Sequence, residues 1–169
     1  RSRVSAIERL VPSLSLGLAA LSGAVGAIMM QNVFRAMRQA ENAGIEAIYG
    51  VMAEVYSAAF AVLLFAAGVG VVGILVSGVR IFTTNRTSSP PGILFLLPAA
   101  VALVPPMMTS YAGWLAISTI NAPRSGGISD VIGTITILNW GAVGISIFSL
   151  LVMAAFSFIP FKSRNGRKI

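Results

Sequence analysis

The chain has 169 residues, of which 56% are hydrophobic and 10% are charged, and its formal net charge is +7. In soluble globular domains roughly a quarter of the residues are charged, so this composition excludes an ordinary soluble domain. The sequence contains no cysteine and no histidine, which excludes disulfides, thiolate chemistry and histidine-ligated metal sites.

Four long stretches lack Asp, Glu, Lys and Arg and are predicted to contain transmembrane helices. They cover residues 10–34, 55–79, 87–123 and 131–161. About 20 apolar residues at ~1.5 Å each cross a hydrocarbon layer of ~30 Å, so each stretch is long enough to span it. The sequence therefore predicts an all-α integral membrane protein, a single membrane domain whose four transmembrane helices form two hairpins.

The expected helices cover approximately residues 11–34, 54–82, 91–120 and 130–161. In the first of them, Ala19, Gly23 and Ala27 place small side chains four residues apart. That spacing puts the three on one helix face, where a second helix can approach closely. We therefore expect this face to pack against another helix.

The polar segment at residues 35–54 keeps helical character on both sides of a turn expected at Ala43 and Gly44. It carries arginines and glutamates that could pair with one another in an outer loop. Solvated pairs of this kind contribute only ~0–1 kcal/mol. The residues concerned are Arg35, Arg38, Glu41, Glu46 and Glu54.

The second predicted helix has a glycine-rich centre. Gly68, Gly70 and Gly73 match the G-x-G-x-x-G dinucleotide fingerprint formally, but they lie inside a run of Val, Leu and Ala without the strand and turn that this fingerprint requires. Helix packing is the better interpretation, with Gly70, Gly73 and Ser77 as the contact residues.

The third and fourth predicted helices carry prolines and one amide. Pro105 and Pro106 remove helical N–H donors, and we expect Thr109 and Ser110 to bond the carbonyls that this frees. In the fourth helix, the strongly polar Asn139 is expected to form a hydrogen bond with another helix. Gly141 and Gly144 are further candidates for helix packing.

Basic residues flank the predicted spans. With the N-terminus inside, nine Lys and Arg lie on the inner side and three lie on the outer side, which satisfies the positive-inside rule. The inner residues are Arg1, Arg3, Arg9, Arg80, Arg86, Lys162, Arg164, Arg167 and Lys168, and the outer ones are Arg35, Arg38 and Arg124.

Both termini are therefore expected on the cytoplasmic, matrix or stromal side of a bacterial or archaeal plasma membrane or of an organelle inner membrane. The basic C-terminal tail, residues 162–169, is expected to contact anionic lipid headgroups. Because the basic residues flank the apolar stretches and form no basic face interleaved with aromatics, a nucleic-acid partner is not expected.

Residues 21–29 (LSGAVGAIM), followed by Phe34 and Met37, form an outward helix, and residues 52–60 (MAEVYSAAF) begin a returning one. In these segments the hairpin of residues 10–80 resembles the core of the MotA/TolQ/ExbB proton-channel family. The resemblance implies a chain that assembles around a partner helix.

The same resemblance implies where an ion path would run. The pore-facing threonines of the family would fall at Ala24 and Ala58, which leaves Ser22 and Ser57 as the hydroxyls of the hairpin. The polar candidates for an ion path are Ser22, Ser57, Glu54 and Asn139.

Taken together, the residues predict a non-catalytic subunit of a larger membrane protein complex, which could be an energy-transducing one. The expected partners are other integral-membrane subunits. An ion-channel or stator subunit that forms a ring around a partner helix is the alternative, and a small-solute carrier made of two two-helix repeats ranks below both. An enzyme is not expected, because Asp and Glu lie at the predicted surface and no nucleophile–base set exists. For the same reason no cofactor or metal is expected.

Overall fold

The computed structural model describes residues 2–84, 93–121 and 127–158, and over these residues it contains helices and no strands. The elements are α1 (Ser2–Asn42), η1 (Ile45–Ala47, a 3-10 turn), α2 (Ile48–Thr84), α3 (Ile93–Asn121) and α4 (Gly127–Phe158). Each of the four α-helices contains an apolar segment long enough to cross a membrane. The prediction of an all-helical chain with four such helices is confirmed.

Helix α1 extends beyond the predicted span of residues 11–34 at both ends, and its continuation to Asn42 agrees with the helical character expected for residues 35–42. Its 41 residues correspond to about 60 Å, well beyond the thickness of a hydrocarbon layer. Charged residues limit an apolar span, but they do not end a helix, and Arg, Gln, Met, Ala and Glu are good helix formers. The helix continues for this reason until Asn42, whose Nδ2 donates a hydrogen bond to the Arg38 carbonyl at 3.0 Å.

A tight connection then reverses the chain. Gly44 has extended backbone angles (φ −60°, ψ 161°), and its carbonyl accepts a hydrogen bond from the Ala47 N–H at 3.0 Å. The turn lies at Ala43 and Gly44, as predicted from the sequence.

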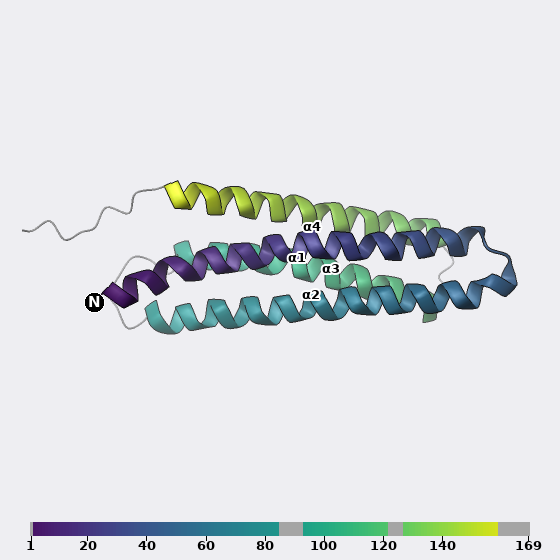
Figure 1. Cartoon of the computed structure of the whole chain (residues 1–169), viewed down its shortest axis with the longest axis horizontal. Coiled ribbons are helices and arrows are strands. Elements are labelled where there is room, and N and C mark those ends of the chain that lie inside the picture. The colour runs from purple at the N-terminus through teal and green to yellow at the C-terminus, as the bar shows by residue number, and fades with distance from the viewer. Residues whose placement is uncertain (1, 85–92, 122–126, 159–169) are drawn as a thin grey trace, which may run out of the picture.

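The four helices alternate in direction and form an antiparallel bundle (Figure 1). Each helix contacts the next one in the chain, and α4 also contacts α1. The bundle has an inner pair, α1 and α3, which touch across its centre, whereas α2 and α4 lie on opposite sides of that pair. Burial agrees, because the most apolar segments of α1 and α3 are 44% buried and those of α2 and α4 are 28% buried.

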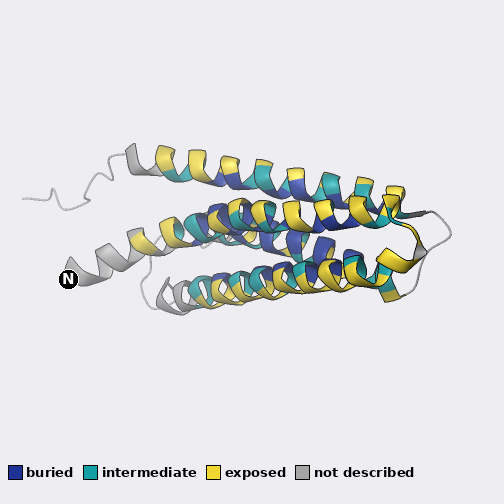
Figure 2. Cartoon of the chain, turned by 45° about the vertical axis from the view of Figure 1, so that its right-hand side comes forward, coloured by how far each residue is buried: buried dark blue, intermediate teal, exposed yellow. Residues whose placement is uncertain are grey.

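The hydrophobic core faces the bundle axis, and the outward surfaces of the helices are exposed (Figure 2). Because α1 packs against all three other helices, it contributes several of the most buried side chains. The core cluster consists of Met30, Val33, Ala36, Met37, Val55, Ala59, Val62, Ala112, Leu115, Ala116, Val131 and Ile135.

Helix α3 remains helical through Pro105 and Pro106, which are both buried. The carbonyls that lose a helical donor lie four residues earlier, at Val101 and Ala102. The Thr109 hydroxyl instead lies 2.9 Å from the Pro105 carbonyl and 3.2 Å from the Pro106 carbonyl. The expectation that Thr109 compensates the freed carbonyls is therefore wrong, because a threonine side chain reaches back only one turn.

The backbones of α2 and α3 approach each other closely at Gly113. A Cβ atom at this position would lie 2.8 Å from the carbonyl oxygen of Ala59 and 3.3 Å from the backbone nitrogen of Leu63. Those atoms belong to the backbone of α2, so they cannot rotate away. The crossing of α2 and α3 depends on the absence of a side chain at Gly113.

We expect Gly113→Ala to lower the free energy of unfolding by about 1–3 kcal/mol, the usual effect of overpacking. The matched control is Gly144→Ala on α4, where an added Cβ meets no atom within 4 Å. That variant should be neutral or stabilising by up to about 1 kcal/mol, because alanine favours helix. Unfolding of both purified variants in detergent measures the difference, and equal effects would contradict the assigned crossing.

Candidate functional site

The crossing of α1 and α4 is made by small residues and one hydroxyl. The Ser146 Oγ on α4 lies 2.8 Å from the Ala142 carbonyl of its own helix and 3.0 Å from the Ala19 carbonyl of α1. One O–H is thus shared between two helices. Gly23 lies directly against this serine, and a Cβ there would overlap the Ser146 side chain. The predicted pair Ala19 and Gly23 therefore lies at a helix crossing.

Three of the four predicted glycines of α2 and α4 lie against α3. A Cβ at Gly73 would be 3.5 Å from Leu103 Cδ2, and one at Gly70 would be 3.8 Å from Pro106 Cβ. A Cβ at Gly141 would press on the end of the Met108 side chain.

The remaining predicted packing residues have weaker contacts. Ala27 is half-buried, and the half-buried Ser77 donates its hydroxyl to the Gly73 carbonyl of its own helix at 2.7 Å. Gly144 is exposed and faces away from the other helices of this chain. A spacing of four residues identifies a helix face, but it does not say whether that face is covered.

Sequence reasoning missed three contact residues, Ser146, Gly113 and Gly26. A Cβ at Gly26 would lie 2.9 Å from Thr109 Cγ2, so this glycine lets α1 approach α3. Each of the three has a small residue four positions before it, which is the same signal that identified Ala19 and Gly23. The spacing of small residues therefore marks these three positions as well.

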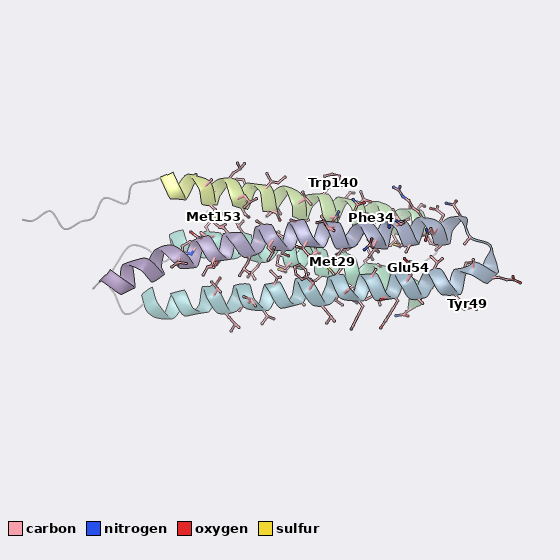
Figure 3. The ribbon with its side chains drawn as sticks, viewed as in Figure 1. Met29, Phe34, Tyr49, Glu54, Trp140 and Met153 are labelled. Carbon is pink, nitrogen blue, oxygen red and sulfur yellow. The ribbon has the colours of Figure 1, made fainter. Side chains whose placement is uncertain are left out.

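The four polar residues predicted for an ion path lie in different surroundings. Ser22 is fully buried on α1, and its Oγ has no hydrogen-bond partner. Ser57 and Glu54 are exposed on α2 (Figure 3 labels Glu54). Asn139 is only 5% exposed, on α4. The structure does not bring these four residues together within the chain.

Asn139 does not form the expected bond to another helix through its carbonyl oxygen. Its Oδ1 is buried and accepts no hydrogen bond, and the interhelical hydrogen bond of α4 comes from Ser146 instead. A buried acceptor without a partner costs about 1–3 kcal/mol. Asn139 is therefore an energetically unfavourable residue within the isolated chain.

Asn139 lines a groove of about 660 Å³ between α1 and α4, which we call the α1–α4 groove. The groove lies toward the end of α1 that precedes the turn. Figure 3 labels Phe34 on α1 and Trp140 on α4, the two aromatic residues of its lining. The lining residues are Gln31, Phe34, Arg35, Arg38, Gln39, Asn42, Ala43, Thr136, Asn139 and Trp140.

The lining of this groove contains two arginines and no carboxylate. Arg35 and Arg38 form no ion pair among the residues that the structure describes, so the expected pairing with the three glutamates of the 35–54 segment is wrong. Exposed ion pairs in water offer too little energy to fix long side chains in one geometry. The groove therefore carries positive charge without compensation from within it.

A second outward feature is a row of small residues on α2. Gly50, Ala53, Ser57, Ala61 and Gly68 are all exposed, and their spacings of three, four, four and seven place them on one face of the helix. Added Cβ atoms at the two glycines meet nothing within 4 Å. We call this row, which also includes the larger Leu64, the α2 outer stripe.

Among the described residues, no group of three or more His, Cys, Asp and Glu is placed to hold a metal ion. The basic C-terminal tail lies outside the described residues. Comparisons with protein-family models, curated proteins and solved structures found no match.

We expect Ser146→Ala to destabilise the bundle by about 0.6 kcal/mol, the average for a hydrogen bond between helices in a membrane protein. The control is Ser149→Ala, because the Ser149 hydroxyl bonds only the Ile145 carbonyl of its own helix. The unfolding free energies of the two variants, measured side by side, test the assignment. A larger loss at Ser149 would contradict it.

Proposed function

We propose that this chain is a multi-pass integral membrane protein and a non-catalytic subunit of a larger membrane complex. Its four long apolar helices support insertion. The excess of Lys and Arg at one end of the spans supports a topology with both termini on the cytoplasmic, matrix or stromal side. The membrane is then a bacterial or archaeal plasma membrane or an organelle inner membrane.

The observation that carries the subunit assignment is the α2 outer stripe. Inside the chain, close crossings are made where a small residue of one helix receives another helix, as at Gly23, Gly73 and Gly113. The stripe has the same kind of residues at the same spacing, but it faces outward. Lipid tails gain little van der Waals contact energy from such a row, whereas the backbone of another helix can pack closely against it. A transmembrane helix of another subunit is the occupant that fits.

A bulky side chain in the stripe should prevent this assembly. Ala61→Leu is expected to convert the complex extracted from native membranes in mild detergent into a smaller species, because overpacking at a close contact costs about 1–3 kcal/mol. The measurement is the native mass of the extracted chain. Its unfolding temperature should not change, since Ala61 is exposed in the chain alone.

The matched control for Ala61→Leu is Ala100→Leu, which makes the same substitution on an exposed surface of α3. It should leave the native mass unchanged. Retention of the large species by Ala61→Leu would contradict the role of the stripe. A wild-type chain that is extracted as a stable monomer would contradict the subunit assignment itself.

A second candidate function is an ion-channel or stator subunit, as implied by the resemblance to the MotA/TolQ/ExbB family. It is favoured by the exposure of Ser57 and Glu54 on α2, where a neighbouring copy or a partner helix would face them. In that arrangement the ion path would run between chains.

If that path exists, Ser57→Ala should lower ion flux through vesicles that contain the complex by about tenfold, the equivalent of one lost hydrogen bond of about 1.4 kcal/mol. Ser149→Ala, which removes a buried hydroxyl from α4, serves as the control. Unchanged flux in Ser57→Ala counts against a channel and leaves the subunit proposal intact.

A further inference from the structure

We infer that the α1–α4 groove binds the headgroup of a phospholipid that carries both a negative charge and a hydrogen-bond donor. Arg35 and Arg38 would hold the phosphate, and the Asn139 Oδ1 would accept a hydrogen bond from a hydroxyl or ammonium group. This inference rests on the membrane insertion proposed above, but not on assembly through α2.

The charge of the groove selects an anion. Arg35 and Arg38 are three residues apart on α1, so both side chains leave the same side of the helix. Both line the groove, no carboxylate lines it with them, and neither forms an ion pair among the described residues. A guanidinium group presents several N–H donors in a planar fork that matches the oxygens of a phosphate.

Asn139 adds a requirement that the phosphodiester of a lipid alone cannot meet, because a phosphodiester has no O–H group. Its side chain is 5% exposed and lines the groove, and its Oδ1 is enclosed without a hydrogen-bond partner, so a turn of the amide about χ2 would present this oxygen to a ligand in the groove. That oxygen is an acceptor, so it needs a ligand with an O–H or N–H group. The ligand must therefore combine an anion with a donor, as phosphoglycerol and other hydroxylated phospholipid headgroups do.

The position of the groove favours a lipid. Arg35 is the first charged residue after the charge-free residues 10–34, so the groove lies where the apolar part of α1 ends. Phe34 and Trp140 line it, and Trp140 is 69% exposed. On α4, Trp140 lies within the apolar segment Ile128–Ala155. The groove therefore extends from the level of Arg35 and Arg38 into the apolar layer, as a site for a headgroup and the adjoining part of its acyl chains would.

The size and lining of the groove also favour a lipid over a protein helix. A volume of about 660 Å³ is in the range of small-molecule sites and exceeds the needs of a free phosphate ion. Ala43 and Thr136 are the small residues of the lining, and they come from different segments and form no row. A helix of a partner would need a row of small residues to approach closely, as in the α2 outer stripe.

The test uses the purified full-length chain in detergent, with lipid retention measured by native mass spectrometry. Three lipids with the same acyl chains test the need for a negative charge and the need for a hydrogen-bond donor separately. Phosphatidylglycerol has the charge and the hydroxyls, phosphatidylethanol has the charge without a donor, and phosphatidylcholine has neither a net charge nor a donor. We expect retention to decrease in that order.

Two variants and one control test which residues cause the preference for phosphatidylglycerol. The double variant Arg35→Gln/Arg38→Gln should weaken phosphatidylglycerol binding about tenfold or more, as expected when charge-assisted hydrogen bonds are lost. The control Arg80→Gln/Arg86→Gln makes the same change of charge at two basic residues that do not line the groove, and it should have a much smaller effect. Asn139→Leu should keep the preference for an anion and lose the preference for phosphatidylglycerol over phosphatidylethanol.

Several outcomes would overturn the inference. It is wrong if Arg35→Gln/Arg38→Gln lowers binding no more than Arg80→Gln/Arg86→Gln does, or if Asn139→Leu retains the preference for the hydroxylated lipid. Competition by inorganic phosphate at millimolar concentration would show that the occupant is a free anion, which also overturns the lipid assignment. The single variants Arg35→Lys and Arg38→Lys, which keep the charge, should weaken binding less than the double variant if both variants remain folded.

Failure of this inference is distinguishable from failure of the proposed function. Recovery of the wild-type chain in carbonate-washed membranes tests insertion separately, and absence from that fraction would contradict insertion. If the chain is inserted and the arginine variants bind lipid normally, the headgroup site alone is wrong. The native mass of Ala61→Leu reports on assembly and does not depend on the groove.

Discussion

Close approach of helix backbones at small residues is the constraint on which this bundle depends. The surfaces of its helices are apolar nearly all round, so hydrophobic burial alone does not select one packing over another. Contact is specified where a side chain is missing, as at Gly113 against the α2 backbone and at Gly23 against Ser146. Small residues on the long helix α1 face two of its neighbours, because Gly23 lies against Ser146 of α4 and Gly26 lies against Thr109 of α3.

Hydroxyl groups in this bundle are mostly satisfied within their own helices. Thr119, Thr136 and Ser149 each bond a carbonyl one turn earlier, which makes them compatible with an apolar environment. Ser146 has the added partner Ala19 on another helix. Two buried atoms depart from this pattern, because the Ser22 Oγ and the Asn139 Oδ1 have no hydrogen-bond partner among the described residues.

The two outward features lie on opposite sides of the bundle, because α2 and α4 flank the inner pair of helices. The α2 outer stripe is small and almost uncharged, as a surface that receives another helix should be. The α1–α4 groove is polar, cationic and bordered by aromatic residues, as a surface that receives a headgroup should be. One chain can therefore contact a partner subunit on one side and a bound lipid on the other without competition between them.

The sequence by itself determined the number of helices, their approximate positions and the turn at Ala43 and Gly44, because the lack of charge over long apolar stretches and the location of turn residues are local properties. The tertiary structure alone decided which small residues are covered. Gly23 and Gly144 have the same side chain and comparable sequence surroundings, yet one lies against Ser146 and the other is exposed. Likewise, Arg35 and Asn139 are distant in the chain, and they line one groove only because α4 packs back against α1. Sequence spacing defines the faces of a helix, whereas the neighbour that each face meets depends on how all four helices pack.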